Sequence, residues 1–133
     1  MYNINSFQLM LIQIRKRPGL YLASKSLTSL YNFWQGYAER DFMEIWEKKT
    51  GKNYFENYEE ASRTNVTKLY DERDSYFMDG FDEFVHRYYN VNVGALNGIT
   101  LIIRENNSEE EAFDKFFELF DEFLKQKDDA TFE

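Results

Sequence analysis

Acid–base chemistry in this chain would depend on one histidine, His86, and 24 acidic side chains, because the chain has no cysteine. Acid–base catalysis commonly uses groups tuned near neutrality, and one histidine among solvated carboxylates is a poor supply of such groups. No Gly-x-Ser-x-Gly turn frames a serine nucleophile, and thiolate chemistry is excluded. We therefore expect no catalytic residue and a structural role for His86. An enzyme that pairs His86 with a carboxylate is the weakest of three interpretations.

Neighbouring carboxylates could instead hold a metal ion, and they occur at 71–74, 79–83 and 128–129. None of these clusters has the alternating Asp or Asn with a central glycine that is typical of a calcium loop. The six glycines are scattered singly, so no phosphate-binding loop is present either. We expect no metal and no cofactor.

Three consecutive cations at 15–17 could contact phosphates. The cluster is short, however, and it lies in a chain of net charge −8, so binding to nucleic acid would be weak and salt-sensitive. Cations at the C-terminal end of a helix also offset the helix dipole. We expect this second role, with Arg17 placed to pair with a carboxylate, and no binding of nucleic acid.

The negative charge is concentrated at the C-terminal end of the chain. Residues 1–104 carry 13 acidic and 13 basic side chains, whereas residues 105–133 carry 11 acidic and three basic ones. An acidic pole repels nucleic acid and membrane surfaces and attracts basic proteins. The alternative interpretation is a solvated helix face followed by a loose tail.

Apolar spacing in the first half of the chain predicts two helices. The first covers 6–17 and ends at Pro18-Gly19, which form a corner before a short extended connector, with Tyr21 and Leu22 entering the core. The second begins after an N-cap at Ser26 and ends at 48–51, with Trp34 and Tyr37 on its packing face. Gly36 lies inside this helix, where we expect it to admit a neighbouring backbone.

The second half is less regular until its end. We expect a helix near 59–70 or a long loop, then a helix over 80–89 capped by Asp79, with Tyr88 on its apolar stripe. Residues 95–104 fit a helix better than a strand. Ser108 and Glu111 predict a capping box, followed by a helix over 108–126 with a stripe of phenylalanines inside and acidic residues outside. Residues 127–133 should fray.

These elements predict one domain over 1–133, an all-α or mostly α bundle of about five helices. A short strand near 99–104 is the alternative for that segment. Hydrophobic residues make up 43% of the chain, which is enough to build a core. No apolar run is long enough for a membrane span. The first apolar run precedes the basic cluster, the reverse of a secretory signal, so we expect a cytoplasmic protein with no membrane association.

The segment RKRPGLYL, at 15–22, resembles the arm that precedes the ATP-binding core of the DNA gyrase B subunit. In that family, the next helix carries Glu-x-x-Asp-Asn and an Asp-x-Gly-x-Gly turn follows. The helix expected here reads SLTSLYNFWQGYAERDF and contains neither pattern. An ATPase is therefore rejected.

A longer resemblance covers most of the chain. The segments RPGLYL with SLTSLYNFWQGY, then GFDEFVHRYYN, then SEEEAFDKFFELFDEFLK occur in this order. Together they resemble immunity proteins of polymorphic toxin and contact-dependent growth inhibition systems in bacteria. The resemblance implies a non-catalytic cytoplasmic inhibitor that binds a cognate toxin domain and blocks its active site or substrate path.

Many such toxins are nucleases with basic substrate channels, which an acidic protein surface would complement. We therefore expect toxin-binding residues on the acidic face of the last helix, with nearby tyrosines as hot spots. These residues are Glu111, Asp114, Glu118, Asp121, Glu122, Tyr54, Tyr58 and Tyr76. The opening motif is then scaffold, formed by Arg17, Pro18, Gly19, Tyr21, Trp34, Gly36 and Tyr37. The second interpretation is a non-catalytic interaction or regulatory module of a bacterium or mobile element. Nothing in the sequence decides the oligomeric state.

Overall fold

The computed structural model describes residues 6–64, 78–91 and 96–131, and these residues form seven helices and no strand. The helices are α1 (Ser6–Lys16), α2 (Pro18–Leu22), α3 (Leu27–Thr50), α4 (Tyr58–Ser62), α5 (Phe81–Tyr88), α6 (Gly98–Glu105) and α7 (Glu109–Thr131). The all-α prediction is confirmed, with more helices than the five expected.

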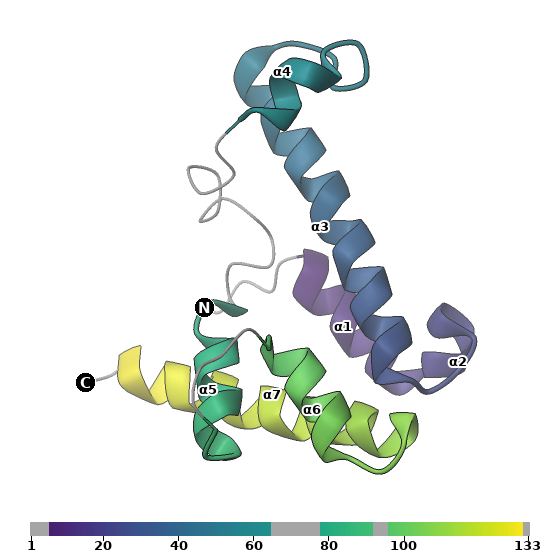
Figure 1. The fold of residues 1–133 in the computed structure, drawn as a ribbon, viewed down its shortest axis with the longest axis vertical. Coiled ribbons are helices and arrows are strands. Elements are labelled where there is room, and N and C mark those ends of the chain that lie inside the picture. The colour runs from purple at the N-terminus through teal and green to yellow at the C-terminus, as the bar shows by residue number, and fades with distance from the viewer. Residues whose placement is uncertain (1–5, 65–77, 92–95, 132–133) are drawn as a thin grey trace.

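The helices form a body and a projection (Figure 1). The body contains α1, α2, α5, α6, α7 and the first half of α3, and α3 extends from it to a far end beside which α4 lies. The main core contains buried side chains from all the long elements of the body, including Phe7, Leu11, Leu30, Phe81 and Ile102. A second, smaller core surrounds Trp46 near the far end of α3.

Helix α7 supplies the largest share of aromatic core. Phe113, Phe116, Phe117, Phe120 and Phe123 are all buried, as the helical spacing predicts. The predicted capping box is half formed: Ser108 Oγ accepts from the Glu111 amide at 3.1 Å, while the Glu111 carboxylate accepts from the Asn107 amide instead. The helix runs to Thr131, beyond its expected end near residue 126, and so includes most of the expected frayed tail.

The caps of α3 agree with the sequence. Ser26 Oγ accepts from the Ser29 amide at 3.2 Å, and Gly51 ends the helix in the left-handed region at φ 71°. Such a φ costs glycine nothing because it has no Cβ. Both ends of this long helix are therefore set by local chemistry.

Three local predictions are wrong. The expected extended connector is helical from Pro18, because proline at the first helical position has no amide hydrogen that needs a partner. The N-cap of α5 is Gly80 rather than Asp79. Tyr88 is half exposed rather than part of the core.

The preference for a helix over a strand in the segment 95–104 is confirmed, because residues 98–105 form helix α6. Asn97 caps this helix by accepting from the Thr100 amide at 2.8 Å. For the segment 59–70 we expect a helix or a long loop; Tyr58–Ser62 forms the short helix α4, and residues 65–77 lie outside the described part.

Candidate functional site

The outward side of α7 carries the five acidic candidates, and helical geometry divides them into two rows. Residues seven apart in an α-helix lie on the same line of its surface. Asp114 and Asp121 form the row nearer α1, and Glu111, Glu118 and Glu122 run along the middle of the exposed side. We call these last three the α7 acidic row. All five side chains are exposed.

The two aspartates are engaged within the molecule. Asp114 pairs with Lys25 at 2.8 Å, and Asp121 pairs with Arg15 at 2.9 Å. The Arg15 guanidinium also lies over the Phe117 ring, 5.2 Å from its centroid. These pairs join α7 to α1 and to the α2–α3 connection, so part of the negative charge is neutralised by cations from the other end of the chain.

Among the described residues, the α7 acidic row makes no ion pair with another helix. Glu118 contacts Lys115 of its own helix at 3.1 Å, and Glu122 accepts a long hydrogen bond from Gln126. The Glu111 carboxylate is occupied by the Asn107 amide. The carboxylates of this row therefore remain at the surface on the side of α7 that faces away from the core.

An exposed tyrosine borders the row. The Tyr88 hydroxyl of α5 accepts from Lys115 Nζ at 3.2 Å, and the ammonium lies 5.5 Å from the centroid of its ring. The hydrogen bond to Tyr88, followed by the one to Glu118, raises the pKa of Lys115 above its usual 10.5. Lys115 thus stays charged and holds Tyr88 beside the acidic row. Helical spacing alone assigns Tyr88 to the core-facing stripe, and no sequence signal distinguishes a buried from an exposed tyrosine at this position.

The predicted tyrosine hot spots do not join this surface. Tyr54 is buried in the small core around Trp46, and Tyr58 is exposed on α4. Figure 1 places α4 at the far end of α3, away from α7. Tyr76 lies outside the described residues. The expectation that these tyrosines neighbour the acidic face of α7 is therefore wrong for Tyr54 and Tyr58.

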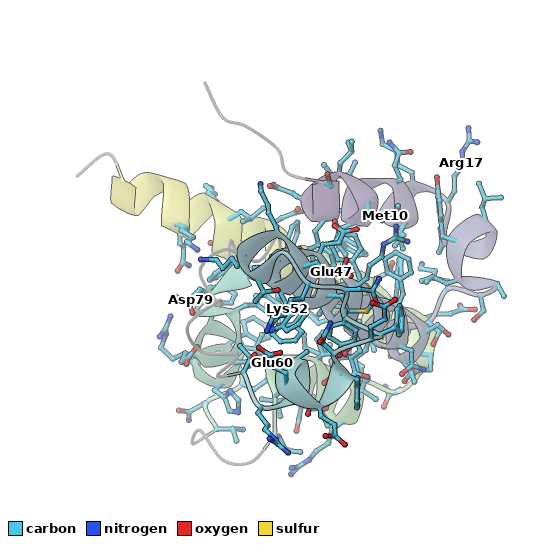
Figure 2. The ribbon with its side chains drawn as sticks, turned by 90° about the horizontal axis from the view of Figure 1, so that it is seen from above. Met10, Arg17, Glu47, Lys52, Glu60 and Asp79 are labelled. Atoms are coloured by element: carbon cyan, nitrogen blue, oxygen red, sulfur yellow. The ribbon has the colours of Figure 1, made fainter. Side chains whose placement is uncertain are left out.

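The scaffold motif is only partly as expected. Pro18 begins α2, but Gly19 and Tyr21 are exposed, so Tyr21 does not enter the core. Arg17 lies at the outer edge of the molecule and points away from it (Figure 2). It forms no ion pair with the described residues. The cation of this cluster that pairs with a carboxylate is Arg15, not Arg17 as expected.

On α3, Trp34 and Tyr37 are core-facing, with ring centroids 5.0 and 4.9 Å from that of Phe7. Gly36 is exposed, and a Cβ built there meets no atom within 4 Å, so its expected role is wrong. The glycine that does admit a neighbour is Gly98, where a built Cβ would lie 2.9 Å from Asp82 Oδ1 and 3.3 Å from Asp82 Cα. Sequence reasoning missed this position.

His86 is 2% exposed. Its Nδ1 lies 2.6 Å from the Asp82 carbonyl oxygen, to which it donates because a carbonyl only accepts, and Nε2 has no hydrogen-bond partner in the described part of the chain. A cavity of about 300 Å³ lies between α3, α5 and α6, lined by residues such as Trp34, Asp82 and Glu83, but His86 is not in its lining. His86 is thus buried and does not face this cavity.

Comparison with known protein families, with characterised proteins and with solved structures gave no match for this chain. Within the described residues, no group of three or more histidine, aspartate or glutamate side chains is arranged to hold a metal ion. None of the helices there combines the length and the apolar character that crossing a membrane requires.

Proposed function

We propose that this protein is a bacterial immunity protein, which binds the toxic domain of a delivered effector in the cytoplasm and covers its active site or substrate path. The toxin is a basic protein, in the simplest case a nuclease. The observation that carries the proposal is the α7 acidic row, Glu111, Glu118 and Glu122. The resemblance of the RPGLYL, GFDEFVHRYYN and SEEEAFDKFFELFDEF segments to immunity proteins agrees with it.

The row is well suited to bind a cationic protein because its support is rigid. Five buried phenylalanines anchor the inner side of α7, so the carboxylates on its outer side keep fixed relative positions. Fixed charges need little ordering on binding, and a patch of one sign accelerates encounter with a patch of the other. A nuclease channel, built to hold phosphates, presents such a positive patch.

The test is co-expression with the toxic domain encoded directly upstream, inactivated where necessary for purification. The wild-type protein should restore growth and co-purify with that domain. Glu118→Lys combined with Glu122→Lys should weaken binding at least about tenfold, mainly through a slower association rate, and should reduce the salt dependence of the affinity. Calorimetry and stopped-flow measurements at low and high salt would check this.

The matched control is Glu44→Lys combined with Glu105→Lys, which changes the net charge equally at exposed positions on α3 and α6. Binding should be almost unchanged in this variant. A wild-type protein that neither binds the toxic domain nor rescues growth would contradict the proposal and favour an interaction module with another partner. Equal losses in both double variants would show that net charge matters and that the α7 acidic row does not.

A further inference from the structure

The second half of α3 supports a structure that is separate from the body. Its last side chain packed against the main core is Tyr37, whereas Phe42 and Trp46 belong to the second core with Tyr54 and Ala61. From Tyr37 to the helix end at Thr50, an α-helix rises about 20 Å. Residues 51–64, which we call the distal tip, therefore stand well away from the body (Figure 1).

Hydrogen bonds hold the distal tip in one conformation. Glu47 accepts from the Tyr54 amide at 2.8 Å, and the Trp46 indole donates to Thr64 Oγ1 at 3.0 Å. An ion pair of 2.8 Å joins Lys52 to Glu60, and Figure 2 shows the two side by side near Glu47. The loop is thus built as a fixed platform, although it contributes nothing to the main core.

The platform presents two aromatic rings to solvent. Phe55 is 75% exposed and Tyr58 is 59% exposed. Both rings stand edge-on to the buried Tyr54, with centroid distances of 5.6 and 5.8 Å. Large apolar side chains held out at a projecting point are typical of binding sites, where a buried aromatic anchor supplies much of the affinity.

The charge around the two exposed rings indicates which chemical groups a partner would present to them. Phe55 and Tyr58 line a shallow groove together with the carboxylates of Glu56, Glu59 and Glu60 and with one cation, Arg63, so that negative charge predominates in the lining. Glu60 is paired with Lys52, but Glu56 and Glu59 form no ion pair with the described residues. A lysine or arginine side chain could lie over either ring and meet these carboxylates, which combines cation–π and charge attraction.

From this geometry we infer that the distal tip is a second contact for the toxin, with Phe55 as its anchor against a basic segment of the toxin surface. This inference depends on the function proposed above. One partner could reach both sites: a domain of about 100 residues has a radius of gyration of about 13 Å, comparable with the roughly 20 Å by which the tip stands off the body. The tip would add apolar affinity, while the α7 acidic row sets the rate of encounter.

The experiment measures binding of the same upstream-encoded toxic domain to Phe55→Ser and to Tyr58→Ser. Each substitution should raise the dissociation rate, by at least about tenfold for Phe55→Ser. The association rate and its salt dependence should stay near those of the wild-type protein. The matched control is Leu20→Ser on α2, because Leu20 is 69% exposed on the body. It should leave both rates unchanged.

Several results would overturn the inference. Suppose that Phe55→Ser dissociates at the wild-type rate while Glu118→Lys with Glu122→Lys binds weakly. The distal tip is then not a contact for the toxin, and the proposed function still stands. Loss of binding in Leu20→Ser as large as in Phe55→Ser would show a general apolar effect. Absence of binding by the wild-type protein would remove both proposals. Circular dichroism confirms folding of each variant.

Other occupants are separate outcomes of the same variants. Phe55-dependent dimerisation in sedimentation experiments would assign the tip to a second copy of this chain. Phe55-dependent binding to phosphatidylglycerol vesicles would assign it to a membrane surface, against the repulsion expected from its carboxylates. Either result would overturn the assignment to the toxin.

Discussion

At the scale of single residues, the contact between Asp82 and Gly98 organises the junction of α5 and α6. The Gly98 amide donates to Asp82 Oδ1 at 2.7 Å, and the Asp82 carbonyl oxygen accepts from His86. A side chain at position 98 would fill the space that this approach requires. Gly36 has no such neighbour, so the two glycines have opposite consequences although both lie in helices.

This contrast gives a paired prediction. Gly36→Ala should raise the free energy of unfolding by about 0.5–1 kcal/mol, because alanine favours helix and restricts the unfolded chain. Gly98→Ala should lower it by about 1–3 kcal/mol, because the Cβ overlaps Asp82 and would force the helices apart. Urea unfolding followed by circular dichroism measures both. Equal effects of the two substitutions would refute the assigned contact.

At the scale of elements, the distal tip depends on Tyr54. Its amide and hydroxyl contact two glutamates of α3, Glu47 and Glu39, and its ring lies against Trp46. Burial first, then the charge and hydrogen bond of Glu39, raise the pKa of Tyr54 above its usual 10.0. Tyr54 is thus a support of the tip and not the contact residue that its position beside Tyr58 suggests.

The raised pKa of Tyr54 makes the stability of the tip sensitive to alkaline pH. A folded-state pKa above the unfolded value contributes stability that is complete below about pH 10 and is lost as the pH rises through the folded-state pKa. In an absorbance titration at the tyrosinate band, Tyr54 should ionise late and together with a change in Trp46 fluorescence. Tyr54→Phe should remove this coupled step.

Tyr89 provides the comparison for that titration. Burial raises the pKa of Tyr89 as well, but Tyr89 is the C-cap residue of α5 and packs against the main core, not in the tip. Tyr89→Phe should therefore remove one late ionisation from the absorbance titration and leave the change in Trp46 fluorescence in place. A Trp46 signal that persists in Tyr54→Phe would contradict the role given to Tyr54.

At the scale of the whole molecule, Glu109 connects the two longest helices. Its carboxylate accepts from the Thr28 amide at 3.3 Å and from the Thr28 hydroxyl at 3.0 Å, and Ser26 Oγ lies 3.5 Å away. Glu109 is also in the first turn of α7. One carboxylate thus lies at the N-terminal ends of both α3 and α7, where the helix dipoles favour negative charge.

We expect Glu109→Ala to lower the free energy of unfolding by about 1–2 kcal/mol, because it removes a capping acceptor from α3 and the link to α7. Glu110→Ala is the control. Glu110 lies in the same first turn of α7 and is exposed, and its substitution should change stability by no more than about 0.5 kcal/mol. Urea unfolding distinguishes the two. Similar losses in both variants would mean that the dipole alone, and not the contact with Thr28, is responsible.

The sequence by itself determined the features that arise from local chemistry. The phenylalanine stripe of α7, the caps of α3 at Ser26 and Gly51, and the all-α class follow from spacing and from backbone groups that need partners nearby. These features depend on interactions between residues a few positions apart, so the spacing of residue types along the sequence is enough to predict them.

Tertiary structure decided what depends on partners distant in the chain. Asp114 and Asp121 differ from Glu118 only because Lys25 and Arg15 fold next to them, and Tyr54 and Tyr58 differ only in which one meets Trp46. The need for glycine at 98 arises from Asp82 on another helix. Whether a surface charge is free or neutralised, and whether an aromatic ring is buried or exposed, depends on which helices meet, and helical periodicity does not determine that.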